Sequence, residues 1–459
     1  MASTVQNLSH KAERKAASLL LDQFIKKLDD KENRAQTYVK IVDLAEKFIG
    51  NKENKDKFSA VREIVQDQDN RWMRFINRIV DESHPNVLKT TLLNLGYEAF
   101  LHGTKTIREN REKYDCNIPW LILFDPTSAC NMHCEGCWSG TYGHKSNLSY
   151  EDMDKIVTQG KELGTYLYMM TGGEPLVKKK EILKLAKKHY DAMFAIYTNS
   201  TLIDEEFCRE VQSLGNIMFQ LSIEGTPDTN DSRRGEGHYR AVIKAMDLLK
   251  EHGIIFGTSI CYTRANIDAV TDESFLRMIS EKGARYGFYF HYMPVGNDAA
   301  PELLPTPEQR ELVYRRIRKY RATKPLFAID FQNDAEYTNG CIAGGKRYLH
   351  INANGDVEPC AFIHYSDSNI REKTLLESLQ GPLFMAYHDN MPFNDNMFRP
   401  CPMLENPQFL RDMVQCSGAC STDVQSPESA EHLTEKTIPY ADRWVPKADE
   451  LWAERKNQG

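Results

Sequence analysis

The feature that most constrains the fold is a regular alternation of short apolar runs and amphipathic stretches between residues 120 and 293. The apolar runs predict strands, and the stretches with a 3.6-residue period predict helices. Such alternation is typical of repeated βα units, whose parallel sheet carries functional groups at the carboxyl ends of its strands. We therefore expect an α/β fold with an open, partial (β/α)6 TIM-like barrel. The predicted strands are 120–125, 166–170, 193–198, 217–223, 254–262 and 286–293, and the predicted helices are 149–163, 178–190, 204–214, 238–251 and 271–283.

The regions on either side of this alternation differ from it. Residues 9 to about 112 show helical periodicity almost throughout, which predicts an all-α N-terminal region. Beyond Pro301 we expect a helix at 306–322, then a small cysteine-rich extension, then a polar tail with a possible last helix. The predicted domains are 1–112, 113–300, 301–425 and 426–459.

Composition excludes several classes of protein. The chain has 459 residues, of which 41% are hydrophobic, so two or three domains with sizeable cores are expected. Its formal net charge of -7 gives no basic surface for nucleic acid. No apolar run approaches a membrane span of about 20 residues, and the N-terminus resembles no signal peptide, so we expect a cytoplasmic protein. Eleven cysteines in such a chain favour reduced thiolates that bind metal over disulfides.

Three cysteines lie close together directly after the first predicted strand. Cys130, Cys134 and Cys137 follow the apolar run 120–124 with the spacing CX3CX2C. One interpretation is a structural zinc site, completed by His133 or His144. The other is a four-iron cluster, which three protein thiolates leave with one iron open to a small molecule.

A glycine pair follows the second predicted strand. Gly172 and Gly173 lack Cβ atoms, so backbone there can approach a ligand, while Glu174 offers an acceptor for an ammonium group and Pro175 ends the strand ladder. An ordinary strand-to-helix turn is the alternative. Together, CX3CX2C and this Gly-Gly-Glu-Pro segment resemble the signature of the radical S-adenosylmethionine (radical SAM) superfamily.

The resemblance implies a reaction and its cofactors. In that superfamily a 4Fe-4S cluster binds SAM at its open iron and cleaves it reductively to a 5′-deoxyadenosyl radical, which abstracts hydrogen from a C–H bond of the substrate. An external one-electron donor, flavodoxin or ferredoxin-like, is implied as a partner. The family usually has an aromatic residue before the third cysteine; this chain has Gly136 there and Trp138 after it.

Other positions match the family's SAM contacts more loosely. The segments after the third and fourth predicted strands contain Asn199, Ser222 and Glu224, where the family presents ribose and carboxylate contacts. An arginine that would bind the SAM carboxylate usually follows in this family. Arg233 or Arg234 occupies that place here, and we favour Arg234. The alternative is that Asn199 and Ser222 cap helices and that Arg234 forms a surface ion pair.

A second set of cysteines lies in the C-terminal extension. Between Cys341 and Cys360, the dipeptide Asn354-Gly355 predicts a β-hairpin that returns Cys360 toward the start of the segment. The spacing C-X13-G-X4-C resembles the opening of the SPASM domain, and later cysteines match it only in part, so the resemblance implies a truncated SPASM-like extension with one auxiliary iron–sulphur cluster. Its candidate ligands are Cys341, Cys360, Cys401 and one of Cys416 and Cys420; zinc, or buried free thiols, is the alternative. For Cys116, Cys208 and Cys261 we expect packing roles.

The substrate is not identified by these motifs. A peptide or protein, a small molecule, and a lipid or other apolar molecule all stay open, and a non-catalytic iron–sulphur or zinc scaffold is the alternative from another class. The N-terminal region contains 20 lysines and arginines against 17 acidic residues, and its helix 9–29 has an apolar stripe from Ala17 to Leu28. That stripe either packs on neighbouring helices or forms a lid or docking surface beside the barrel mouth, with possible peripheral membrane contact.

Overall fold

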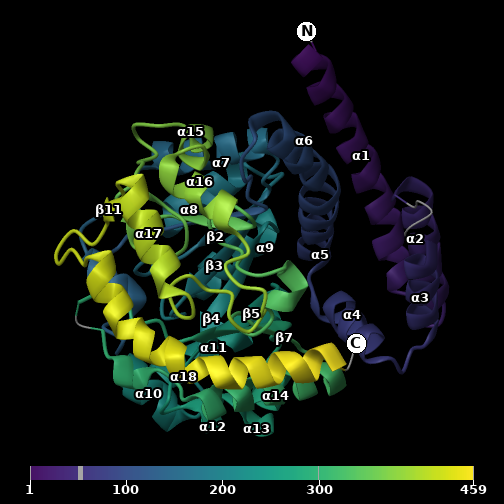
Figure 1. Cartoon of the computed structure of the whole chain (residues 1–459). Coiled ribbons are helices and arrows are strands. Elements are labelled where there is room, and N and C mark those ends of the chain that lie inside the picture. The colour runs from purple at the N-terminus through teal and green to yellow at the C-terminus, as the bar shows by residue number, and fades with distance from the viewer. Residues whose placement is uncertain (1, 50–54, 298, 458–459) are drawn as a thin grey trace.

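A computed structural model of the chain describes residues 2–49, 55–297 and 299–457. Helices form the N-terminal region, and the rest of the chain builds a parallel sheet surrounded by helices, with the C-terminal helix lying across one side (Figure 1). The predicted α/β fold with a partial barrel and a helical N-terminal region is confirmed.

The central sheet contains every predicted strand. Within the described residues its strand order is β7-β6-β5-β4-β3-β2-β1-β8-β9, and neighbours from β7 through to β8 run parallel. The two ends of this order do not pair with each other, so the barrel stays open. The six predicted strands are β1 (Leu121–Phe124), β2 (Leu167–Met170), β3 (Met193–Thr198), β4 (Ile217–Ser222), β5 (Phe256–Tyr262) and β6 (Tyr286–His291).

Three further strands extend the sheet at its edges. β7 (Phe327–Asp330) pairs with β6, and β8 (Tyr348–Ile351) pairs with β1 in parallel. β9 (Val357–Glu358) returns antiparallel to β8 around Gly355, whose φ of 91° lies in the left-handed region, so the predicted hairpin is confirmed. The C-terminal segment thereby joins the same sheet as the first strand.

The predicted helices between the strands are present and pack on the outer face of the sheet. They are α7 (Tyr150–Leu163), α8 (Lys179–Lys188), α9 (Glu205–Leu214), α11 (His238–Glu251) and α13 (Glu273–Glu281), with α10 (Pro227–Arg234) and α12 (Ile267–Thr271) between them. In α7 the apolar period buries Met153, Ile156 and Val157 against the strands. A Ser149–Asp152 capping box begins α7, and Gly164 ends it.

The N-terminal helices close the amino-terminal end of the barrel. They are α1 (Ala2–Leu28), α2 (Arg34–Ile49), α3 (Lys55–Gln66), α4 (Arg71–Glu82), α5 (Pro85–Thr91), the π-helix η2 (Leu92–Gly103) and α6 (Thr104–Tyr114). Their polar groups bind backbone carbonyls just before strands β2 to β6: Asn110 to Leu163, Asn94 to Ala192, Asn86 to Ser213, the His84 amide to Gly253, and Arg78 to Ser280. The N-terminal helices thus dock at the amino end of the barrel, whereas the cysteine loop lies at its carboxyl end. The prediction that these helices form a lid beside the barrel mouth is therefore wrong.

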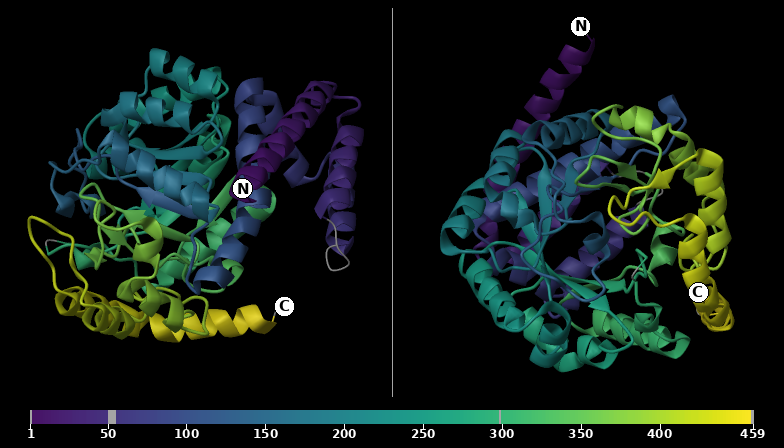
Figure 2. Two further views of the ribbon diagram at one scale, coloured as in Figure 1. Left: turned by 90° about the horizontal axis from the view of Figure 1, so that it is seen from above. Right: turned by 90° about the vertical axis from the view of Figure 1, so that its left-hand side faces the viewer.

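Apolar side chains complete this closure. Leu95 of η2 and Trp120 pack against Leu167, Met193 and Ala195, which are buried at the amino end of the inner face of the sheet. Figure 2 shows the N-terminal helices as a group beside the barrel. The N-terminal helices therefore plug the end of the sheet at which no functional groups were expected.

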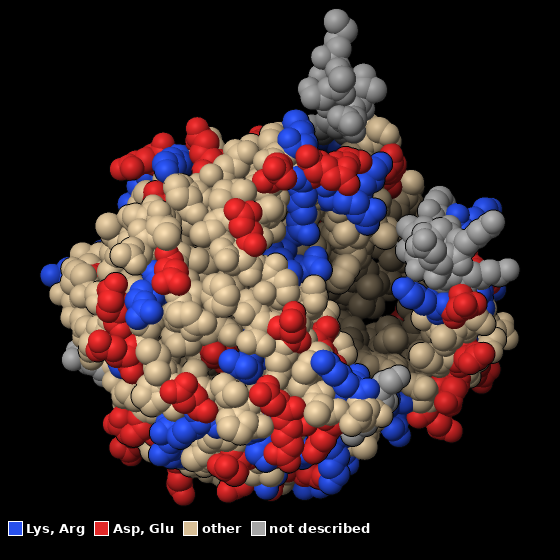
Figure 3. Space-filling view, viewed as in Figure 1, with Lys and Arg blue, Asp and Glu red and all other residues tan. Residues whose placement is uncertain are grey.

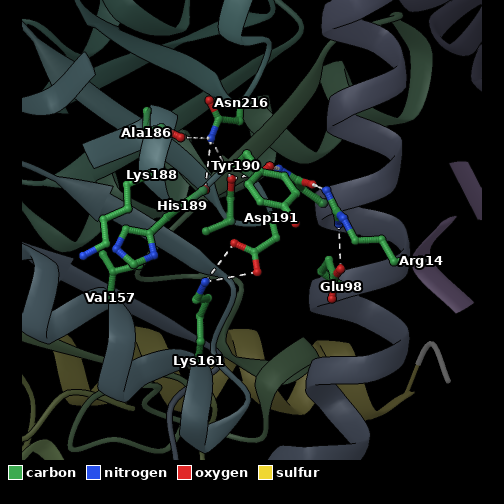
Figure 4. A network of polar contacts seen from close by, with 12 residues as sticks. Arg14, Glu98, Val157, Lys161, Ala186, Lys188, His189, Tyr190, Asp191 and Asn216 are labelled. Carbon is green, nitrogen blue, oxygen red and sulfur yellow. Dashed lines mark hydrogen bonds and ion pairs between the residues drawn. The ribbon is translucent and has the colours of Figure 1, made fainter. Parts of the chain in front are cut away.

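A polar network joins α1 to this closure (Figure 4). The guanidinium of Arg14 binds the carboxylate of Glu98 at 2.6 Å and the side chain of Asn94 at 2.8 Å, and Glu98 is fully buried. His10 lies 2.7 Å from the other oxygen of Glu98. Since Asn94 also binds the turn before β3, the first helix is anchored to the barrel through η2.

The C-terminal elements pack along the open barrel. They are α14 (Pro307–Thr323), α15 (Leu375–Leu379), α16 (Pro382–Asn390), α17 (Pro407–Ser417), the short strands β10 (Tyr365–Ser366) and β11 (Cys420–Ser421), and α18 (Ala430–Asn457). Helix α14 lies beside β7, and α15 lies beside α7. Trp444 of α18 is fully buried and lies over the guanidinium of Arg310. No described helix is long and apolar enough to cross a membrane. The face in Figure 3 mixes acidic and basic residues and is hollowed between the N-terminal helices and the barrel.

Candidate active site at the carboxyl end of the sheet

The three cysteines lie on the loop that follows β1. Hydrogen bonds within this loop hold its two arms together: the Ser128 amide donates to the Ser146 carbonyl at 2.9 Å, and the Leu148 amide donates to the Pro126 carbonyl at 3.1 Å. Cys130 and Cys134 are half-buried, and Cys137 is exposed. The loop therefore presents thiols at the carboxyl end of the strands, where the βα pattern places functional groups.

The glycine pair lies directly against this loop. The Gly173 amide donates to the Thr127 carbonyl at 3.0 Å, and the Glu174 amide donates to the Ala129 carbonyl at 2.8 Å. A Cβ on Gly173 would lie 2.2 Å from the Ala129 oxygen, and Gly172 has a φ of 105°. The two motifs that the sequence separates by about one βα unit are thus hydrogen-bonded to each other, and only glycine fits the contact.

Glu174 is buried and already has partners within the chain. Its carboxylate accepts hydrogen bonds from the Leu176 amide at 3.0 Å, the Thr198 hydroxyl at 2.8 Å and the Asn199 amide at 2.7 Å. Burial raises the pKa of this carboxyl to about 7 in spite of these bonds. Glu174 therefore ties the ends of β2 and β3 together, and one oxygen, Oε2, accepts only one of the three bonds.

Asn199 lies beside the first cysteine. Its Nδ2 is 4.0 Å from Cys130 Sγ and 2.8 Å from the side-chain oxygen of Asn131. Ser222 ends β4 and is half-buried on the inner face of the sheet. The helices that follow these two positions are capped by Asp204 and Thr226, so the helix-cap alternative for Asn199 and Ser222 is wrong.

Glu224 and the two arginines form a buried ion cluster beside the second cysteine. Arg233 Nη1 and Arg234 Nη2 lie 2.9 and 2.7 Å from the fully buried Glu224 carboxylate. Burial opposes ionisation of Glu224, but Arg234 and Arg233 outweigh it and lower the pKa of this carboxyl. Arg234 Nη1 is also 4.0 Å from Cys134 Sγ. Arg234 is therefore part of the site and not half of a surface ion pair.

The thiols are close enough to influence one another electrostatically. Burial, with smaller contributions from Glu174, Cys137 and Cys134, raises the pKa of Cys130 to about 11. No three His, Cys, Asp or Glu side chains of the described residues converge on one metal-ion position. The candidate zinc ligand His144 has its Nδ1 3.1 Å from the Ser128 carbonyl oxygen. In a four-iron cluster each thiolate binds a different iron, which needs a wider spacing than one zinc ion does.

Known proteins match this arrangement. Residues 124–281 match the family model described as the Radical SAM superfamily, and this range begins at the end of β1 and contains both motifs. Residues 124–281 therefore form a radical SAM domain, and this part of the chain belongs to the radical SAM superfamily. The protein is a radical SAM enzyme, and these comparisons do not determine its substrate.

Characterised relatives align with most of their own length. The chain is 23% identical over 290 residues to the AdoMet-dependent heme synthase of Methanosarcina barkeri, covering 57% of this chain and 82% of that protein. It is 24% identical over 353 residues to the PqqA peptide cyclase of Granulibacter bethesdensis, covering 70% of this chain and 90% of that protein. Streptococcus suis SuiB bound to S-adenosylmethionine has a similar fold, with a TM-score of 0.53 and 17% identity over 65% of this chain and 76% of that one.

The inner face of the radical SAM barrel is apolar and partly accessible. Tyr197, Phe288, Phe290 and Phe331 are half-buried there, whereas the alternate residues of the same strands are buried against the helices. Neighbouring rings are in contact, with centroid distances of 5.9 Å for Phe288 and Phe290 and 5.1 Å for Phe290 and Phe331. Cys261 lies on the same face, half-buried, while Cys116 and Cys208 are buried as expected for packing residues.

Three cysteines of the C-terminal extension share one environment. Cys341, Cys360 and Cys401 belong to, or pack against, a single apolar cluster. The Tyr348 hydroxyl lies 2.6 Å from Cys360 Sγ, and the Met403 amide lies 3.4 Å from Cys401 Sγ. The hairpin and the loop before α17 thus bring together thiols that are 60 residues apart in the sequence.

Cys416 and Cys420 are not brought to this group. Cys401 lies just before α17, its carbonyl accepting the Asn406 amide, whereas Cys416 is near the other end of that helix, roughly 14 Å along its axis. Both Cys416 and Cys420 are exposed. These positions do not support Cys416 or Cys420 as the fourth ligand of the auxiliary cluster, which stays a prediction.

Sequence reasoning missed a buried charged network at the same end of the barrel. His350 of β8 lies between Asp125, which follows β1, and Glu358 of β9, and all three are buried. The only sequence signals are an Asp directly after the first strand and polar residues at inward positions of a short apolar strand. Their partnership depends on the pairing of β8 with β1, which the sequence does not reveal.

Proposed function

We propose that this protein cleaves SAM reductively and uses the resulting radical on a C–H bond of its substrate. Cys130, Cys134 and Cys137 would hold the 4Fe-4S cluster and leave its fourth iron for SAM. The observation that carries this proposal is the direct hydrogen bonding of the Gly172–Glu174 segment to the cysteine loop. An ordinary strand-to-helix turn does not require its glycines to contact the backbone of another loop.

The residues around the thiols fit such a group. When bound, the cluster and SAM would supply a 5′-deoxyadenosyl radical, the reagent for hydrogen abstraction. Gly172 and Gly173 let the end of β2 pack closely on the cysteine loop, and Glu174 keeps that backbone in place and offers an acceptor toward the SAM ammonium group. Asn199, Ser222, Glu224 and Arg234 line the adjoining strand ends, and Arg234 offers a guanidinium to the SAM carboxylate.

The inner face of the barrel supports a substrate with an apolar part. Its accessible aromatic side chains lie between the SAM site and the plug of N-terminal helices, and an apolar group would cover surface that water now contacts. A peptide, a small molecule or a lipid with such a group all fit this description. The relatives named a heme synthase and a peptide cyclase span two of these classes.

Partners follow from the chemistry. Each SAM cleavage needs one electron, so we propose an external donor of the flavodoxin or ferredoxin type. Cluster ligation by reduced thiols fits the cytoplasm. Peripheral membrane contact of the N-terminal region stays a prediction, which co-sedimentation with anionic liposomes at low and high salt would test.

We also propose an auxiliary iron–sulphur cluster in the truncated SPASM-like extension. Cys341, Cys360 and Cys401 would be its thiolate ligands, supported by their shared environment. A cluster there would bind three thiols, of which Cys360 is buried and Cys341 and Cys401 are half-buried.

The test of the main proposal replaces the thiols of the triad. In a Cys130→Ala, Cys134→Ala, Cys137→Ala variant, anaerobically reconstituted with iron, sulfide and a reductant, we expect no 5′-deoxyadenosine from SAM, while circular dichroism shows unchanged helix content. A Cys116→Ala, Cys208→Ala variant, which removes two buried thiols far from the loop, is the control and should retain cleavage. Sustained SAM cleavage by the triad variant would show that the assignment is wrong.

A further inference from the structure

A buried network connects the residues that begin the cysteine loop and precede the glycine pair to the C-terminal hairpin. His350 Nε2 lies 3.0 Å from Asp125, and its Nδ1 lies 2.6 Å from Glu358. Asp125 also accepts the hydroxyl of Thr171 at 2.7 Å, and Thr171 directly precedes the glycine pair. The hydroxyl of Tyr142, five residues after Cys137, donates to Glu358 at 2.8 Å.

The charges of this network require one another. Asp125, His350 and Glu358 are at most 1% exposed, and two buried carboxylates without a cation are costly. Burial alone would lower the pKa of His350, but Asp125 and Glu358 outweigh it and raise this pKa to about 10. The positive charge of the His350 imidazolium therefore offsets the free-energy cost of burying both carboxylates.

The residue next to the third cysteine packs on this network. The ring of Trp138 contacts His350 edge-on at a centroid distance of 5.7 Å and Phe362 at 5.8 Å. Tyr142 stacks on His364 at 4.3 Å. His350, Phe362 and His364 come from the C-terminal hairpin and the segment just after it. The segment 138–142, which directly follows the third cysteine, is therefore held by residues more than 200 positions away in the sequence.

We propose that His350, held between Asp125 and Glu358, is a positioning residue through which the C-terminal hairpin fixes the cysteine loop for SAM binding. The fixing of the loop stands on the contacts above, whereas the role in SAM binding rests on the proposed function. His350 itself touches none of the candidate cluster ligands. It acts through Asp125, which begins the loop, and through Trp138 and Tyr142, which follow its last cysteine.

Amide hydrogen exchange of the reconstituted protein tests this proposal without SAM. In His350→Gln we expect exchange of residues 125–142 to accelerate about tenfold or more, while helices α4 to α6 keep their protection. The affinity for SAM, measured by equilibrium dialysis, should fall in parallel. His189→Gln is the matched control, since His189 is also buried and lies 2.8 Å from the carboxylate of Asp154, but at the amino end of β3.

A second variant separates positioning from general destabilisation. His350→Gln, Glu358→Gln removes the cation together with one carboxylate, so exchange of residues 125–142 should return part of the way toward wild type. If His350→Gln does not fold, Glu358→Gln alone should show the same local acceleration. Unchanged exchange of 125–142, or acceleration spread equally over all segments, overturns the proposal. Neither result depends on SAM cleavage, so the proposed function is judged separately by the cysteine triad variant.

Discussion

At the scale of single residues, Gly173 decides how closely the two SAM motifs approach. A Cβ there would lie 2.2 Å from the Ala129 oxygen and 2.5 Å from the Ser128 oxygen, both backbone atoms that have little freedom to move. In Gly173→Ala we expect SAM cleavage to fall about a hundredfold, because a displacement of about 1 Å at a positioned group has that effect. Overpacking should also lower the free energy of unfolding by about 1–3 kcal/mol.

The matched control is Gly96→Ala in η2, where a Cβ would meet nothing within 4 Å. This variant should keep wild-type SAM cleavage and should unfold at an equal or slightly higher denaturant concentration. Wild-type cleavage by Gly173→Ala would mean that the loop and the glycine segment are not as closely packed in solution.

At the scale of elements, the contact of α1 with η2 holds the first helix on the barrel. Arg14→Met leaves the buried Glu98 carboxylate with His10 as its remaining ionic partner, so we expect the free energy of unfolding to fall by about 3 kcal/mol. Arg62→Met is the control, because Arg62 pairs with Asp43 and Glu46 near the surface of α2 and α3 and should cost less than about 1 kcal/mol.

Urea unfolding measures both variants. Arg14→Met, Glu98→Gln should recover most of the loss, since it removes the unpaired charge together with its partner. Equal costs for Arg14→Met and Arg62→Met would mean that α1 is not anchored by this ion pair.

The position of α17 leads to a prediction about the auxiliary cluster. Cys401→Ala, combined with the triad replacement, should remove the remaining iron, of which about four atoms per chain are expected. Cys416→Ala, Cys420→Ala on the same background should retain that iron, since both thiols are exposed, Cys416 in the last turn of α17 and Cys420 beyond its end. Iron and sulfide analysis distinguishes these results. Loss of iron from the second variant, or zinc in place of iron, would contradict this assignment.

At the scale of the whole molecule, two buried histidines make stability depend on pH. Burial, followed by repulsion from a nearby arginine, lowers the pKa of His238 to about 4 and that of His291 to about 3. Below pH 6.5, the pKa of histidine in the unfolded chain, both histidines bind a proton in the unfolded chain but not in the folded one. Their contribution to stability is therefore present above pH 6.5 and is lost as the pH falls toward their folded pKa values. Between pH 7 and 5 we expect a loss of about 2 kcal/mol for each histidine.

Urea unfolding at several pH values checks this effect. In His291→Gln the change in unfolding free energy between pH 7 and 5 should shrink by about half of the expected total, because one of the two titrating groups is gone. An identical pH dependence in wild type and variant would show that His291 does not resist protonation in the folded state.

The sequence by itself determined the elements of the barrel and the centre of the candidate SAM site. Strands β1 to β6 and the helices between them follow from periods of two and 3.6 residues, which are local properties of the chain. Cys130, Cys134 and Cys137 share one loop, and Gly172 to Glu174 follow the next strand, so the parallel βα arrangement alone places them together. Asn199, Ser222, Glu224 and Arg234 were predicted from the resemblance to the family, which presents SAM contacts after the third and fourth strands.

Only the tertiary structure decided how distant segments meet. The pairing of β8 with β1 joins segments more than 220 residues apart, and it alone creates the contact of His350 with Asp125. The docking of the N-terminal helices on the amino end of the barrel, and the separation of Cys416 and Cys420 from Cys401, likewise depend on which faces pack against each other. An amphipathic pattern shows that a face will be buried, but not by which partner, because apolar burial is non-directional.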